Sequence, residues 1–156
     1  MLCPASSGRS PEKNQGIQVI STIEKVLFLK GVDLFHNIPG EDLSHIAQIT
    51  DEVEFNAHEV VVKEGDQGDA MYLIADGKVK VHAGDKILAE LSKPQCFGEM
   101  SILDEEPRSA SVTALSELLL LRILRDDFAE ILAERPEISQ GIIKVLTRRL
   151  RNANRR

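Results

Sequence analysis

Residues 97–112 read FGEMSILDEEPRSASV, and this stretch decides how the chain is interpreted. Gly98 lets a ligand approach the backbone closely, because glycine has no side chain. Residues 99–103 have the length of one helical turn, whose free N–H groups suit an anion. Glu99 supplies a carboxylate that accepts from a hydroxyl, and Arg108 supplies a planar fork that fits a phosphate. Together these groups are suited to bind a ligand that has a sugar hydroxyl next to a phosphodiester.

An alternative is that Glu99 and Arg108 only form a surface ion pair beside a loop, worth under ~1 kcal/mol. That alternative leaves Gly98 unexplained, and it gives no reason for the hydroxyl of Ser109 beside the arginine. We therefore favour a ligand site.

A second stretch, residues 64–74, reads EGDQGDAMYLI and is followed by Gly77. Glycine next to aspartate predicts tight turns, and the apolar run that follows predicts a strand. Two shorter pieces, Leu34-Phe35 and Ile38-Pro39, precede it.

Together these pieces resemble the cyclic-nucleotide-binding domain family, which includes the catabolite activator protein, the regulatory subunits of protein kinase A and cyclic-nucleotide-gated channels. Residues 97–112 resemble its phosphate-binding cassette, and the similarity covers roughly residues 32–150. The resemblance implies a regulatory domain whose ligand is cAMP or cGMP, with no other cofactor. We favour cAMP, but the Ser109 hydroxyl suits either the phosphate or the exocyclic amine of guanine.

The resemblance also implies a role for each matching residue. Glu99 would hold the ribose 2′-hydroxyl, and Arg108 would pair with the cyclic phosphate. The backbone N–H groups of Gly98, Ser101 and Ser109 would complete the anion site. The walls around the base and sugar would come from Val81, Leu88 and Ala89. Three glycines would turn strands: Gly65, Gly68 and Gly77.

Some positions depart from the family pattern. Pro94 and Gln95 stand where glycine and aspartate are usual, and Ser101 stands where alanine is usual. No aromatic residue follows Phe128 to cap the base. A lid would then come from elsewhere on the last helix: Leu146, Leu150 or an arginine that stacks on the base.

The order of helical and strand-like patterns along the whole chain predicts an α+β fold. This is an antiparallel β-roll (a jelly-roll-like double-stranded β-helix) with N-terminal helices and two C-terminal helices. Residues 1–16 are predicted to be disordered or a linker, and 17–156 to form the domain. Short apolar runs between Gly-Asp turns place the roll at about 51–123. Helical spacing places the last helices at about 126–154.

Local residues set the expected helix ends. Ser21 with Glu24 predicts the start of the first helix, and Gly31 its end. Asp126 is expected to cap the first C-terminal helix. Pro136 is expected to separate it from the last helix.

Charge is divided unevenly along the 156 residues. The formal net charge is −6, yet residues 144–156 hold six basic residues and no acid. The remainder holds 13 basic and 25 acidic residues, a balance that repels nucleic acid and anionic membranes. The basic end either complements its own helix terminus or contacts an anionic partner. We predict no nucleic-acid binding by this domain alone.

No residue pattern predicts an enzyme or a metal site. A Gly-x-Ser-x-Gly motif is missing, and the four histidines lack ligand spacing: His36, His45, His58 and His82. Cys3 and Cys96 do not form a disulfide framework. Without a signal peptide or a membrane-spanning apolar run, we expect a cytoplasmic protein and no membrane insertion.

Several functional hypotheses remain. In the first, nucleotide orders the turn at 99–103, which contacts the helices through Met100, Ile102 and Leu103 and moves them. In the second, the same fold is a ligand-free protein-interaction module. In the third, the chain is a fragment of a larger transcription regulator, channel or transporter. The apolar stripe of the last helix also allows a homodimer.

Overall fold

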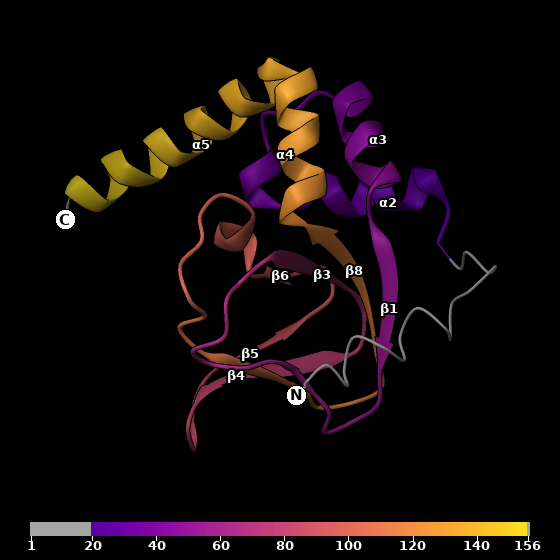
Figure 1. The fold of residues 1–156 in the computed structure, drawn as a ribbon, viewed down its shortest axis with the longest axis vertical. Coiled ribbons are helices and arrows are strands. Elements are labelled where there is room, and N and C mark those ends of the chain that lie inside the picture. The colour runs from indigo at the N-terminus through magenta and orange to yellow at the C-terminus, as the bar shows by residue number, and fades with distance from the viewer. Residues whose placement is uncertain (1–19, 156) are drawn as a thin grey trace.

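Two four-stranded antiparallel sheets face each other in the middle of the chain and form the predicted β-roll (Figure 1). The computed structural model describes residues 20–155, so the segment 1–16 that we expected to be disordered lies outside the described residues. One sheet has the order β1-β8-β3-β6 and the other β2-β7-β4-β5. The strands are β1 Asp51–Phe55, β2 Val60–Val62, β3 Ala70–Asp76, β4 Lys78–Ala83, β5 Lys86–Ser92, β6 Cys96–Phe97, β7 Ser111–Ala114 and β8 Leu118–Leu124.

The central strand β8 is apolar except for Arg122, because both of its faces are covered. Leu120 lies in the core between the two sheets, with Val79 and Ile74. Leu121 and Ile123 lie in a second core under the helices. Successive side chains of a strand point to opposite faces, so this one strand serves both cores.

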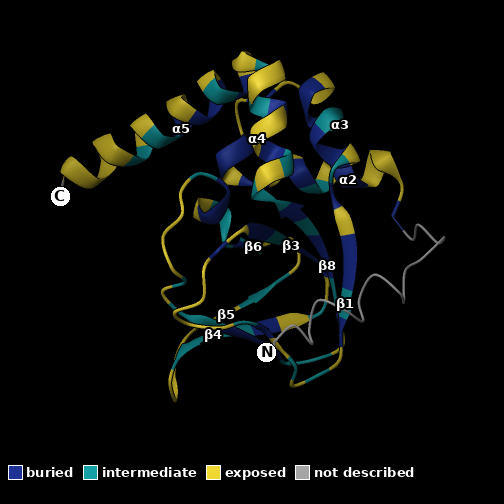
Figure 2. Ribbon diagram, viewed as in Figure 1, coloured by how far each residue is buried: buried dark blue, intermediate teal, exposed yellow. Residues whose placement is uncertain are grey.

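The helices gather on the outer face of the β1-β8-β3-β6 sheet, and their sides that face the sheet are buried (Figure 2). The rings of Phe35 and Phe128 stack at the centre of this layer, with 5.9 Å between their centroids. The α+β fold class is therefore confirmed. The helices are α2 Thr22–Lys30, η1 Asp33–Phe35, α3 Gly40–Gln48, α4 Arg125–Glu134 and α5 Pro136–Asn154.

The helix ends follow their residues with one exception. A capping box between Ser21 and Glu24 opens α2, and Gly31 closes it, as predicted. However, α4 begins at Arg125 rather than after Asp126. Leu124 occupies the N-cap, and Asp126 lies in the first turn, where a carboxylate favours the positive end of the helix dipole.

The long helix α5 is packed along only its first half. Ile138, Ile142 and Val145 are buried against the other helices. Toward its C-terminal end the helix extends away from the body, and Leu150 is 62% exposed (Figures 1 and 2). Within residues 20–155, no helix is long and apolar enough to cross a membrane.

Candidate ligand-binding site

A cavity of about 450 Å³ lies between the β-roll and η2, the 3₁₀ turn Glu99–Ile102 that follows β6. Six of the eight predicted site residues line it: Val81, Gly98, Glu99, Ser101, Arg108 and Ser109. The cavity thus collects the carboxylate, the guanidinium and the hydroxyl that the sequence singles out.

Leu88 and Ala89, the other two predicted residues, do not line this cavity. Both lie on β5, an edge strand whose middle is exposed, and Leu88 is 50% exposed. The apolar wall around Val81 comes instead from Val62 and Val112, on β2 and β7 of the same sheet.

The Arg108 side chain is held by the backbone rather than by an acid. Its Nη2 donates a hydrogen bond to the carbonyl oxygen of Ala70 at 2.8 Å. No carboxylate of residues 20–155 forms an ion pair with Arg108, so the surface ion pair with Glu99 is not formed. Burial lowers the pKa of Arg108, while Tyr72 and Asp69 act in the opposite direction. The guanidinium stays charged, because its ordinary pKa is so high.

Two glycines let the backbone close around this arginine. Gly98 has φ of +78°, and a Cβ atom there would lie 2.4 Å from Nη1 of Arg108. At Gly68, a Cβ atom would lie 2.4 Å from Oγ of Ser101 and 3.2 Å from Nε of Arg108. Our prediction that Gly68 turns a strand is therefore incomplete: the position is needed for close packing against the site. Gly65 and Gly77, with φ of +90° and +102°, do have turn conformations.

Two residues of η2 are placed differently from what the sequence suggested. The N–H of Ser101 donates to the carbonyl oxygen of Gly98 at 2.9 Å, so the turn uses it internally and it is not a free donor. Met100 was expected to pack against the helices, but it is 47% exposed and lines the cavity. Ile102 and Leu103 do join the core that contains Phe128.

Residues 64–74 hold the backbone of the cassette, residues 97–112, in position. The N–H of Gly65 donates to the carbonyl oxygen of Arg108 at 2.9 Å, and the N–H of Arg108 donates to that of Asp66 at 2.8 Å. Gln67 and Pro107 form an isolated β-bridge between the same loops. The β2–β3 loop therefore holds the backbone on both sides of the arginine.

The far half of α5 leaves the cavity open. Leu146 packs against the helix core and Leu150 is exposed, and neither lines the cavity. Arg149 instead bonds Asp33 of η1, with 2.9 Å between Nη2 and Oδ2. Among residues 20–155, no group of three or more histidine, cysteine or carboxylate side chains is arranged to hold a metal.

The similarity that the sequence suggested is borne out by comparison with protein families. The model of the cyclic nucleotide-binding domain matches residues 52–135, which include the roll, the cassette and α4. The chain belongs to the cyclic nucleotide-binding domain family.

Members of this family with curated descriptions match most of the chain. A CRP-like cAMP-activated global transcriptional regulator of Mycobacterium tuberculosis is 37% identical over 123 residues, which are 74% of this chain and 55% of that protein. A cAMP-dependent protein kinase regulatory subunit of Emericella nidulans is 34% identical over 107 residues, 67% of this chain and 26% of the relative. The chain thus spans about half of the first relative and a quarter of the second.

A solved structure shows the same fold. The N-terminal domain of a transcriptional regulator from Streptomyces coelicolor aligns with a TM-score of 0.76 at 32% identity, covering 81% of this chain and 92% of that one. The two chains therefore share the same fold over most of their lengths.

Proposed function

We propose that the chain is a cyclic-nucleotide sensor domain, which binds cAMP in the cavity beside η2 and is not an enzyme. The observation that carries this proposal is the Arg108 guanidinium, which shares the cavity with Glu99 and has no ion-pair partner among residues 20–155. A half-buried cation without a carboxylate favours an anionic ligand. The cavity volume of about 450 Å³ also lies in the usual range for small-molecule sites.

Several polar groups of the cavity match parts of the nucleotide. Arg108 pairs with the cyclic phosphate, together with the Ser109 hydroxyl and the backbone at Gly98. Glu99 accepts from the ribose 2′-hydroxyl. The apolar surface of Val81 and its neighbours on β2 and β7 faces the sugar and base. The Ser109 hydroxyl suits the exocyclic amine of guanine as well as the phosphate, so cGMP is the alternative ligand.

Ligand binding reaches the helices through the core below η2. Ile102 and Leu103 belong to the same apolar core as Phe128 of α4. A nucleotide that draws η2 toward the phosphate changes this packing and so the position of α4 and α5. The helices respond only if the nucleotide binds their two positions with different affinity.

The exposed stripe of α5 gives this sensor a way to meet a second copy. Ile143 and Leu150 are 58% and 62% exposed and lie seven residues apart, on one face of the helix. We place a homodimer contact there. The output domain that responds is a further part of a larger regulator, channel or transporter.

A calorimetric titration with cAMP and cGMP tests the proposal. Thermal unfolding gives a second measurement. A nucleotide at a hundred times its Kd adds about 2.7 kcal/mol to the free energy of unfolding, which raises the melting temperature. Arg108→Ala is expected to cost about 2–5 kcal/mol of binding free energy, and Arg108→Lys to recover part of it. The control is Arg122→Ala, because Arg122 pairs with Asp51 away from the cavity.

The outcome decides between two functions. Unchanged affinity in Arg108→Ala contradicts the assigned site. If the wild type binds neither nucleotide, the ligand-free interaction module is the better description, which the uncovered cavity favours.

A further inference from the structure

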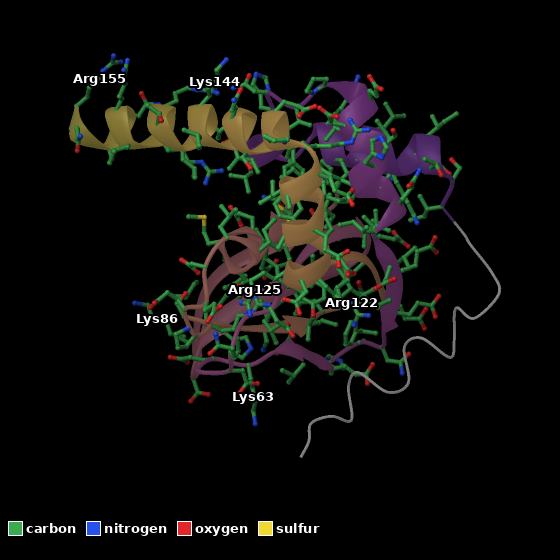
Figure 3. The ribbon with its side chains drawn as sticks, turned by 45° about the horizontal axis from the view of Figure 1, so that its top comes forward. Lys63, Lys86, Arg122, Arg125, Lys144 and Arg155 are labelled. Carbon is green, nitrogen blue, oxygen red and sulfur yellow. The ribbon has the colours of Figure 1, made fainter. Side chains whose placement is uncertain are left out.

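Arg125, labelled in Figure 3, is the first residue of α4, and its hydrogen bonds join that helix to both loops of the cavity. Its Nη1 donates to the carbonyl oxygen of Gly68 at 2.7 Å and to that of Asp104 at 3.2 Å. Its backbone N–H donates to the carbonyl oxygen of Asp69 at 2.8 Å. One residue therefore holds the β2–β3 loop and the end of the cassette at once.

The two carbonyl oxygens belong to segments that shape the anion site. Gly68 packs against Ser101 and Arg108 so closely that it leaves no room for a side chain. Asp104 lines the cavity, two residues after the end of η2. A displacement of either segment must stretch or break a bond to Arg125.

The bonds of Arg125 differ from the other connection between site and helices. The apolar contact through Ile102 and Phe128 has no directional requirement, because burial of apolar surface does not depend on orientation. The hydrogen bonds of a guanidinium are directional and charge-assisted. Among residues 20–155 Arg125 forms no ion pair, and its guanidinium donates to neutral carbonyl groups instead.

We propose that Arg125 is a positioning residue that couples the nucleotide site to α4. The coupling rests on the function proposed above. When nucleotide draws the cassette toward the phosphate, the segment at Asp104 pulls on Arg125, and the first turn of α4 follows. Without Arg125, the nucleotide still meets Arg108 and Glu99, but the helix is released from the loops.

Hydrogen exchange of the nucleotide-free protein tests whether Arg125 holds the two loops through its hydrogen bonds. Arg125→Gln is expected to raise amide exchange in residues 64–70 and 99–108, because both loops lose their shared donor. The β4–β5 hairpin, residues 78–92, serves as an internal reference. Arg122→Gln is the matched control: Arg122 lies three residues earlier, near the end of β8, and pairs with Asp51. Equal exchange in the two variants overturns the proposal.

A fluorescence titration tests the coupling. The chain contains no tryptophan, so Ala133→Trp at the exposed end of α4 is a single reporter. In this background cAMP is expected to change the emission. Arg125→Gln is expected to lose most of that change at saturation while its Kd rises about tenfold, the equivalent of one charge-assisted hydrogen bond. Arg125→Lys, which keeps the charge and reaches one carbonyl, is expected to restore part of the change.

The two measurements separate the failure of each proposal. A full emission change at saturation in Arg125→Gln overturns the coupling. If the wild type binds neither cAMP nor cGMP, the sensor function and the coupling are both wrong, and hydrogen exchange still decides whether Arg125 positions the loops.

Discussion

The guanidinium of Arg108 lies against the backbone of Gly98 so closely that a Cβ atom at position 98 would be 2.4 Å from Nη1. Gly98→Ala must therefore displace the arginine, and it also places an alanine at φ of +78°. We expect the free energy of unfolding to fall by about 1–2 kcal/mol from the left-handed conformation alone. Nucleotide affinity should fall at least about tenfold, since a misplaced charge-assisted bond is worth that much. Urea denaturation and calorimetry measure the two effects.

Gly84→Ala is the control for backbone strain. Gly84 has φ of +60° in the β4–β5 turn, and nothing lies within 4 Å of a Cβ atom placed there. This variant should lose a similar amount of stability and keep full nucleotide affinity. If both variants bind equally well, the contact between position 98 and Arg108 does not matter for the ligand.

The close approach of Gly68 to Ser101 makes a second prediction. Gly68→Ala alone brings its methyl group against Oγ of Ser101, and it should be clearly destabilised. Ser101→Ala alone should cost little, and adding it to Gly68→Ala should recover part of the loss, because the nearest atom is then gone. Thermal unfolding of the four proteins gives the coupling energy. Simple additivity of the two single variants contradicts the packing described here.

The contact between Gly68 and Ser101 also shows where sequence reasoning stops. The cassette could be found because its glycine, acid, arginine and serine occur within twelve residues, and each has a distinct chemistry. Gly68 lies 33 positions before Ser101, and nothing in the local pattern distinguishes it from a turn glycine such as Gly65. Its role depends on the pairing of two loops that only the fold brings together.

Sequence reasoning also could not tell which residues of the short strands face the cavity. Val62, Val81, Leu88 and Val112 have similar side chains, and alternation alone does not tell which face of a short strand looks into a cavity. The start of α4 was misplaced for a related reason. Leu124 still pairs with Ala70 at the end of β8, so the helix follows the strand without a capping side chain, and Asp126 falls inside it.

The ion pair between Arg135 and Asp42 should contribute more to stability than the pair between Arg149 and Asp33. Arg135 lies 2.8 Å from Asp42, whose side chain is only 6% exposed. Arg135→Ala leaves that buried carboxylate without its cation, so we expect a loss of about 1–3 kcal/mol. Arg149→Ala breaks a pair whose side chains are 39% and 63% exposed, which should cost under about 1 kcal/mol. Equal losses in thermal unfolding would contradict this ranking.

Cys96 provides a chemical reporter of the charge on Glu99. The pKa of the Cys96 thiol is raised to about 12, mainly by burial and also by the carboxylates of Glu99 and Asp33, while Arg149 acts in the opposite direction. At about pH 8 the folded protein then holds about a thousandfold less thiolate than an ordinary cysteine, so alkylation should be slow. The measurement uses Cys3→Ser, in which Cys96 is the single thiol.

Two substitutions should change that reaction in opposite directions. Glu99→Gln removes a negative charge, lowers the pKa of Cys96 and speeds alkylation between about pH 9 and pH 10, whereas Arg149→Gln slows it. The same shift affects stability. The folded thiol keeps its proton after the unfolded thiol has lost it, so this contribution is complete below about pH 9 and is lost as the pH rises toward about 12. Saturating cAMP bonds Glu99 through its hydroxyl without removing the charge, so it should slow alkylation only by covering the site. If Glu99→Gln leaves the rate unchanged across this range, Glu99 does not lie close enough to Cys96 to act on it, and the position of that carboxylate in the cavity is wrong.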